Sequence, residues 1–244
     1  MNWREKENIK IVVGINSLVA TSQPAYSNHI QFFYRLGRSY KNIEITLVNP
    51  ARMSIDRMRN MAAEVALKWE ADFLLFLDDD VLVPFTGLAF LLDADADIVA
   101  GDVLIRGYPF PHMFFKYNDK KELLAVTELT DGDPGPIDVD AVGFSFCLIK
   151  TGLLKEIPKP FFLTGPRNTE DIYFCLKCKL TKPDTTIMVD TRVSCGHMLN
   201  PYPITPENVV NYKKYYEAQY PQAIAQSDKD RGNDYYAIVG KRDA

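Results

Sequence analysis

Short runs of apolar residues recur through the first part of the chain. They have the length and composition of strands whose two faces are both covered. Their positions are 9–15, 43–48, 73–77 and 97–103. After Ser54, a suitable N-cap, apolar residues recur at helical spacing from Ile55 to Trp69. This alternation of strand and helix predicts an α/β domain with a largely parallel sheet.

The second part of the chain has more loops and shorter apolar runs. A loop rich in Gly and Pro is expected over 104–112. Strands are expected at 113–117, at 123–129, at 137–149 with an interruption at Gly143, and at 187–190. Helices are expected at 151–157, from Thr169 to about Leu180, and from about Pro206 to Tyr220. No clear linker divides the chain, so we expect a single domain with parts 9–103, 104–200 and 201–244, the last a helix and tail.

Composition narrows the class of protein. The 244 residues are 47% hydrophobic and 25% charged, which excludes a disordered chain, a fibrous repeat and a disulfide-stabilised miniprotein. A net charge of −4 lacks the basic character of a general nucleic-acid-binding protein. No apolar run approaches the roughly 18 residues of a membrane span, and the N-terminus lacks a signal-peptide pattern. We therefore expect a cytoplasmic protein whose four cysteines are reduced.

The most informative polar feature is the acidic triplet Asp78-Asp79-Asp80, which follows the apolar run 73–77. In extended chain Asp78 and Asp80 point to the same side, and converging carboxylates repel unless a positive charge lies between them. A divalent cation supplies such a charge, and open α/β sheets bind ligands outside the carboxyl ends of their strands. The structural alternative is a solvated acidic turn.

Around this triplet the chain resembles the GT-A-fold glycosyltransferases, particularly family 2 and its phage and bacterial relatives. Residues 76–81 resemble the Asp-x-Asp motif of that family. Further similar blocks are an Arg-Asn-x-Ala helix at 56–62, a glycine-containing strand at 142–150, a Glu-Asp helix start at 169–175 and a late histidine motif at 193–197. The resemblance covers residues 9 to about 200. It implies a Rossmann-like, mixed but mainly parallel sheet flanked by helices, in which 9–103 binds the nucleotide-sugar and 104–200 faces the acceptor.

The resemblance implies a chemistry for the triplet and for His197. Asp78 would bind the ribose of the nucleotide-sugar with help from Asp79, while Asp80 and His197 would bind a metal ion. These ligand types, together with phosphate oxygens, suit manganese better than calcium, and magnesium is the alternative metal. The metal would assist departure of the nucleotide. The expected reaction moves a sugar from a nucleotide-diphosphate donor, UDP by default, to a hydroxyl of a saccharide or another acceptor.

Glu170 and Asp171 stand at the start of a predicted helix. Acidic residues there complement the helix dipole, which is the ordinary structural interpretation. An inverting transferase also needs a general base to deprotonate the acceptor hydroxyl. The resemblance implies this role for Asp171, with Glu170 as the second candidate.

Further candidates line the nucleotide. The resemblance places Asn16 and Asn49, which follow the first and second apolar runs, beside the base. Arg57 and Asn60 share a face of the predicted helix, and Arg57 would reach the diphosphate or the base; a solvated helix face is the alternative. Gly143 would permit close approach of a backbone or ligand. 

On the acceptor side, Arg106, Tyr108 and His112 in the Pro-rich loop are candidates, each with an ordinary surface alternative. A C-x-x-C at Cys175 and Cys178 could form a zinc site with Cys195 and His197, although buried thiols are favoured. Two other functions stay open. They are a non-catalytic nucleotide- or carbohydrate-binding module and a sugar-phosphate nucleotidyltransferase. A homo-oligomer is compatible with the sequence.

Overall fold

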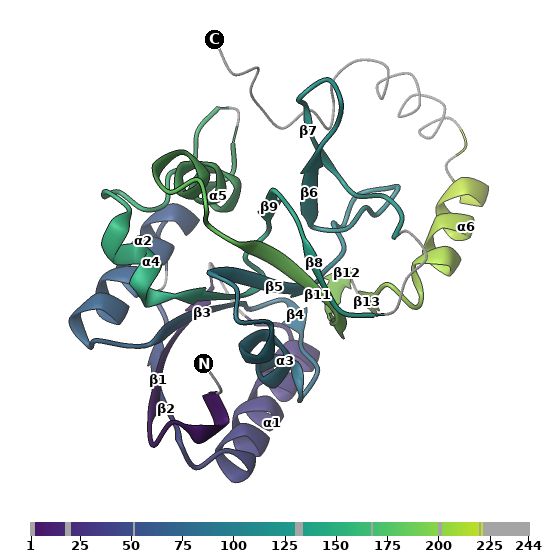
Figure 1. The fold of residues 1–244 in the computed structure, drawn as a ribbon. Helices are drawn as coiled ribbons and strands as arrows, with labels where there is room; N and C mark the ends of the chain where they lie inside the picture. Colours follow the sequence, from purple (N-terminus) through teal and green to yellow (C-terminus); the bar gives the residue numbers. More distant parts are fainter. Residues whose placement is uncertain are drawn as a thin grey trace.

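The computed structural model describes residues 3–17, 21–50, 52–129, 134–166, 168–199, 202–219 and 221. Within these residues, seven strands form a central sheet in the order β2-β1-β3-β10-β5-β11-β8 (Figure 1). The strands are β1 (Ile9–Asn16), β2 (Ile43–Val48), β3 (Phe73–Asp78), β5 (Ile98–Asp102), β8 (Pro136–Asp138), β10 (Phe146–Lys150) and β11 (Ile187–Ser194). Both parts of the chain therefore build one sheet.

The sheet is mixed but mainly parallel. Strand β1 pairs in parallel with β2 and β3, and β5 pairs in parallel with β11. Strand β10 lies antiparallel between β3 and β5, and β8 is antiparallel to β11 at the edge. The carboxyl ends of β1, β3 and β5 consequently meet at one edge, which we call the carboxyl edge.

Helices cover both faces of the sheet, because successive strand residues alternate between two hydrophobic clusters. Leu74 and Phe76 pack toward α2, α4 and α5, whereas Leu75 and Leu77 pack toward α1 and α3. The helices are η1 (Trp3–Glu5), α1 (Gln23–Ser39), α2 (Ile55–Lys68), α3 (Gly87–Ala94), α4 (Thr151–Glu156), α5 (Glu170–Thr181) and α6 (Val209–Gln219). No helix of the described segments has the length and hydropathy needed to cross a bilayer.

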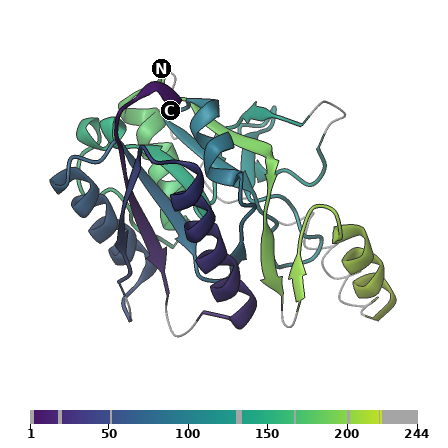
Figure 2. The same cartoon turned by 90° about the horizontal axis from the view of Figure 1, so that it is seen from below.

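Two small sheets extend the carboxyl edge. One has the order β13-β12-β4 and the other β7-β6-β9. Their strands are β4 (Val81–Leu82), β12 (Gly196–Leu199), β13 (Tyr202–Ile204), β6 (Phe114–Tyr117), β7 (Leu123–Ala125) and β9 (Ala141–Val142). Helix α6 lies to one side of the α/β layers (Figure 2), where Tyr212 and Tyr216 pack edge-on against Phe110.

Two strand predictions are wrong. The apolar run 137–149 forms three strands, β8, β9 and β10, because the chain changes sheets around Gly143, whose backbone N–H donates to the Met113 carbonyl at 2.8 Å. The strand expected over 123–129 ends at Ala125, since residues 127–129 are exposed. The last predicted helix begins at Val209. Tyr220 and the tail after Pro221 lie outside the described residues.

Candidate functional site

Polar residues end three strands that run in the same direction to the carboxyl edge, although antiparallel β10 lies between two of them, β3 and β5. Asn16 ends β1, Asp78 ends β3 and Asp102 ends β5, and all three are at least partly buried. Asn16 and Asp78 are partners in the register of β1 and β3. Because the apolar part of each strand is fixed inside the sheet, its last polar side chain is held at the edge where ligands of α/β sheets bind.

The Asp78 carboxylate is held from three sides. Its Oδ2 accepts a hydrogen bond from Ser145 Oγ at 2.9 Å. Its Oδ1 accepts from Asn16 Nδ2 and from Arg59 Nη2, each at 3.4 Å. Burial raises the pKa of Asp78, although Arg59, Ser145 and Asn16 all favour the charged form. The side chain keeps 20% of its surface exposed, so a ligand can still reach it.

Arg59 is a buried charged residue that the sequence interpretation did not single out. It lies on α2 with its side chain 3% exposed, and its guanidinium lies over the rings of Phe76 and Phe144. Its Nε is 3.2 Å from Glu170 Oε1, and neither Nε nor Nη1 has a hydrogen-bond partner among the described residues. A signal was present, because Arg59 occupies the same helical stripe as the buried alanines 62, 63 and 66. A charged residue in an apolar stripe indicates a buried ion pair.

Glu170 and Asp171, at the start of α5, lie in different surroundings. Glu170 is buried beside Arg59. Burial raises its pKa to about 7 against the opposing effect of Arg59, and the charge of Asp171 adds to the rise. Asp171 is half-buried, and its Oδ1 accepts the backbone N–H of Ile172 at 2.8 Å. Of the two carboxyl groups, Asp171 is therefore the more accessible to an acceptor.

Asp80 and His197 face each other across paired strands. His197 on β12 is a register partner of Val81 on β4, directly after Asp80. Its Nδ1 lies 2.7 Å from the carbonyl oxygen of Leu104, which can only accept, so Nδ1 carries a proton. Its Nε2 then faces Asp80 Oδ2 at 3.6 Å. A second proton or a metal ion between these two atoms would hold them together.

Positive charge also reaches the triplet from the loop after β5. Arg106 Nη1 lies 2.7 Å from Asp80 Oδ2. Partial burial acts to raise the pKa of Asp80, but the contacts with His197 and Arg106 outweigh it and lower the pKa. Asp79 differs, because partial burial raises its pKa despite a hydrogen bond with Ser17. Arg106, a sequence candidate for the acceptor side, thus contacts the predicted metal ligand instead.

The cluster carries an excess of negative charge. Its carboxyl groups are Asp78, Asp79, Asp80, Glu170 and Asp171, and the guanidinium groups that contact them among the described residues are Arg59 and Arg106. Burial is the main cause of the raised pKa values of Asp78 and Glu170, and neighbouring carboxylates add to both shifts. A further cation would relieve the excess of negative charge.

The donor set of Asp80 and His197 fits a metal such as manganese. It combines one carboxylate with an imidazole whose tautomer is fixed by a backbone carbonyl, an arrangement common among metal-bound histidines. The described residues contain no group of three acidic, histidine or cysteine side chains that could hold a metal. The zinc site considered for Cys175, Cys178, Cys195 and His197 is not formed; all four cysteines are buried free thiols.

Four other sequence candidates lie apart from this chemistry. Asn49 and Arg57 are exposed, and neither forms a hydrogen bond or ion pair with the acidic triplet within the described ranges. Asn60 serves the fold, since it donates to the Phe162 carbonyl at 2.7 Å and accepts from the Phe161 N–H at 2.9 Å. Gly143 makes a close approach to Met113: an added Cβ would lie 2.3 Å from its side chain.

A second histidine pair lies at the same edge. His112 Nδ1 is 2.7 Å from Asp102 Oδ1, and both side chains are buried. His112 is also the bridge partner of Leu104, the residue that accepts from His197. The sequence interpretation named His112 but not Asp102, which ends an apolar strand just as Asp78 does.

Two surface hollows of about 430 Å³ each lie away from the triplet. One is bordered by Tyr34, Arg35 and Phe85, and the other by Asp138, Asp140 and Lys179. Neither contains a residue of the acidic cluster, so we identify the site by its chemistry and its place on the sheet.

Comparison with known proteins supports the fold. No family model and no curated protein matches the chain by sequence. A197 from STIV aligns with a TM-score of 0.58 at 19% identity, over 82% of this chain and 91% of that one. GalNAc-T7, solved with UDP, GalNAc and Mn²⁺, aligns with a TM-score of 0.48 at 15% identity, over 94% of this chain and 55% of that one, so the chain spans about half its length. The GT-A fold predicted from the sequence is confirmed; membership of family 2 stays a prediction.

Proposed function

We propose that the chain is a metal-dependent glycosyltransferase that moves a sugar from a nucleotide-diphosphate donor, UDP by default, to an acceptor hydroxyl. The observation that carries the proposal is the pair of Asp80 Oδ2 and His197 Nε2, 3.6 Å apart, with the other ring nitrogen protonated by its contact with Leu104. This pair lies beside Asp78 at the edge of a GT-A sheet where ligands bind.

Asp78 holds the nucleoside in this proposal. Its carboxylate is fixed by Ser145, Asn16 and Arg59, so it can accept hydrogen bonds from ribose hydroxyls without reorganising. Asn16 adds a buried Oδ1 that has no partner among the described residues, and a donor N–H or O–H would satisfy it. Asp79, in the turn after β3, assists Asp78 in binding the ribose.

Asp80 and His197 hold the metal ion. When bound, Mn²⁺ or Mg²⁺ would supply positive charge that offsets the charge developing on the departing nucleotide. Leu104 keeps the His197 ring in the orientation that presents Nε2 to the site. The excess of carboxylates would repel an anionic donor, and the bound cation would offset that repulsion.

Asp171 acts as the general base. Its half-buried carboxylate accepts the proton of the acceptor hydroxyl as that oxygen attacks the anomeric carbon opposite the diphosphate. The bond between the anomeric carbon and the diphosphate oxygen breaks in the same displacement, the nucleoside diphosphate leaves, and the product has inverted configuration. Glu170 positions the start of α5 through its contact with Arg59, 3.2 Å away, and thereby links the base to the residue that also holds Asp78.

Calorimetric titration tests the proposal. UDP and GDP are titrated with and without Mn²⁺ into the wild-type protein, into Asp80→Asn and into Asp119→Asn. Asp119 is an exposed carboxylate in the turn between β6 and β7, so its variant is a matched control. We expect Mn²⁺-dependent binding of one nucleotide that is unchanged by Asp119→Asn. Asp80→Asn should weaken it by at least about 10- to 100-fold, the usual loss when even an outer-shell partner of a metal ligand is removed.

The other outcomes separate the alternatives. Absence of nucleotide binding by folded wild-type protein in Mn²⁺ would contradict the proposal. Nucleotide binding without hydrolysis or transfer of any nucleotide-sugar would indicate the non-catalytic module. Release of pyrophosphate from a nucleoside triphosphate and a sugar-1-phosphate would indicate the nucleotidyltransferase.

A further inference from the structure

Arg106 and the proposed metal ion compete for the same atom. Arg106 Nη1 lies 2.7 Å from Asp80 Oδ2, the oxygen that faces His197 Nε2 at 3.6 Å. A cation shared by Asp80 and His197 would therefore lie next to the guanidinium. The cation and the Arg106 guanidinium would repel each other when both contact the same carboxylate. Binding of the cation would therefore weaken the contact between Arg106 and Asp80.

The Arg106 side chain is able to leave while its backbone stays in place. Its side chain is 48% exposed, and its second contact is a 3.4 Å hydrogen bond to the Met198 carbonyl. The flanking backbone is pinned by the bridge between Leu104 and His112 and by a 2.8 Å hydrogen bond from Ile105 N–H to the Pro111 carbonyl. Because its backbone is fixed and its side chain is long, Arg106 can move its guanidinium between two nearby partners.

We propose that Arg106 is a diphosphate-binding residue that changes partner when the metal binds. In the metal-free protein it pairs with Asp80; once Asp80 and His197 hold the metal, its guanidinium turns to the phosphate oxygens of the donor. The inference rests on the proposed function. Arg106 would thus exchange a carboxylate for a phosphate and remain paired in both states.

Charge favours this exchange. The carboxylates around Asp80 outnumber the arginines that contact them, so a dianionic diphosphate meets repulsion there. The Arg106 guanidinium, once released from Asp80, would place positive charge beside the phosphates of the donor. Its planar donors also match phosphate oxygens in bidentate geometry.

Arg106→Gln tests the proposal because it predicts changes of opposite sign. Without the competing guanidinium, Mn²⁺ alone should bind about threefold more tightly, as expected for a partly exposed ion pair. In saturating Mn²⁺, UDP should bind about tenfold more weakly, as expected for a lost hydrogen bond to a charged group. Mn²⁺ binding is followed by electron paramagnetic resonance of the free ion, and UDP binding by calorimetry.

Arg38→Gln is the matched control. Arg38 is an exposed arginine in the last turn of α1, which leads from the carboxyl edge back to the opposite edge of the sheet. The Arg38→Gln variant removes the same charge far from Asp80, so its affinities for Mn²⁺ and for UDP should both stay at wild-type values. Thermal unfolding of each variant checks that it is folded.

Each remaining outcome has a defined meaning. If wild type binds Mn²⁺ and UDP but Arg106→Gln changes neither affinity, only one of them, or both in the same direction, the partner exchange is wrong and the proposed function stands. If wild type binds neither Mn²⁺ nor UDP, the proposed function fails and this inference fails with it.

Discussion

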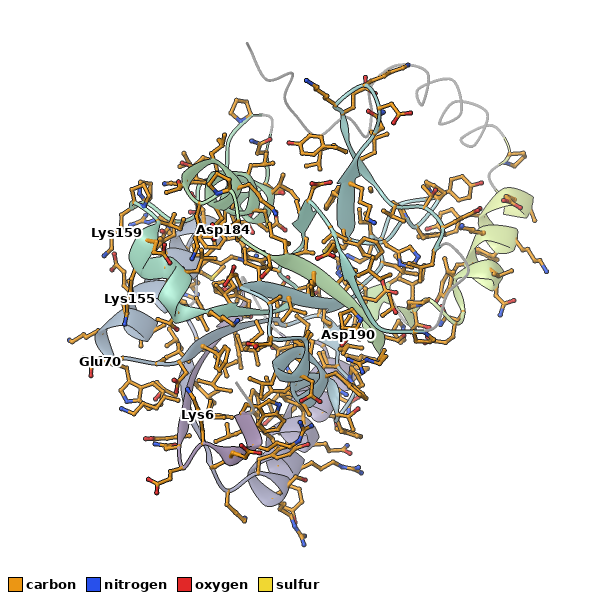
Figure 3. The ribbon with its side chains drawn as sticks, viewed as in Figure 1. Lys6, Glu70, Lys155, Lys159, Asp184 and Asp190 are labelled. Atoms are coloured by element: carbon orange, nitrogen blue, oxygen red, sulfur yellow. The ribbon has the colours of Figure 1, made fainter. Side chains whose placement is uncertain are left out.

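The two edges of the central sheet use charge differently. At the edge opposite the site, Lys6 pairs with Asp72 and Lys150 with Asp95, each at 2.9 Å and each partly exposed (Figure 3 labels Lys6). Each pair brings a lysine to a carboxylate in partly exposed surroundings. At the carboxyl edge, buried or half-buried carboxylates outnumber the arginines that contact them. Solvated ion pairs of this kind are ordinary surface features, whereas a desolvated cluster with more carboxylates than arginines is typical of a functional site.

The largest effect should come from removing the central cation of the carboxyl edge. Arg59→Met leaves Asp78 and Glu170 buried without their shared partner. We expect a loss of about 3–5 kcal/mol in the free energy of unfolding at pH 8, the usual result of breaking one side of a buried pair. Urea denaturation measures it.

A second variant keeps this prediction decisive if Arg59→Met is poorly folded. Adding Glu170→Gln removes one of the two stranded charges, so the double variant should recover part of the lost stability. A loss below about 1 kcal/mol for Arg59→Met would be typical of an exposed pair. Such a small loss would mean that the ion pairs at the two edges of the sheet contribute equally little to stability.

A smaller effect concerns the pH dependence of stability. Burial raises the pKa of Glu170 to about 7, with Arg59 on α2 opposing the shift and Asp171 and Asp78 adding to it. The folded state therefore retains a proton that the unfolded state has released above its own pKa, so stability falls as pH rises from about 4.5 to 7. This group alone should contribute up to about 3 kcal/mol to that fall.

Glu170→Gln should flatten this part of the profile. Urea denaturation at pH 5 and pH 8 gives the difference for wild type and for the variant. Glu64→Gln, which changes an exposed carboxylate, should keep the wild-type difference. Equal pH dependence in wild type and Glu170→Gln would show that Glu170 ionises normally in the folded protein.

The sequence predicted those parts of the site that lie on strongly patterned elements. Asp78 and Asp80 were found because an apolar strand ended in carboxylates, and the sheet indeed places them at its carboxyl edge. His197 was found through a resemblance to a motif, and the pairing of β12 with β4 brings it to Asp80. The α/β class followed from the alternation of strand and helix.

The parts that were missed depend on contacts between distant segments. The pairs of Arg106 with Asp80 and of His112 with Asp102 form only when the loop after β5 folds back along that strand. No local pattern carries that information. The division of 137–149 into three strands likewise depends on partners in two sheets. Arg59 is different from these cases, because its position in an apolar helical stripe can be recognised from the sequence alone.

The smallest expected effect tests the other side of the comparison. Lys6→Gln removes the cation of the Lys6–Asp72 pair, whose side chains are 33% and 32% exposed. Asp72 keeps its 2.9 Å hydrogen bond from the Lys10 N–H, and water can solvate the oxygen that is freed. The loss of unfolding free energy should therefore stay below about 1 kcal/mol. It should shrink further in about 1 M NaCl, where the Debye length falls to roughly 3 Å. Urea denaturation at low and high salt measures both values.

A large loss that salt does not reduce would mean that the opposite edge, too, depends on desolvated charge. An excess of carboxylates would then be the only feature that distinguishes the site.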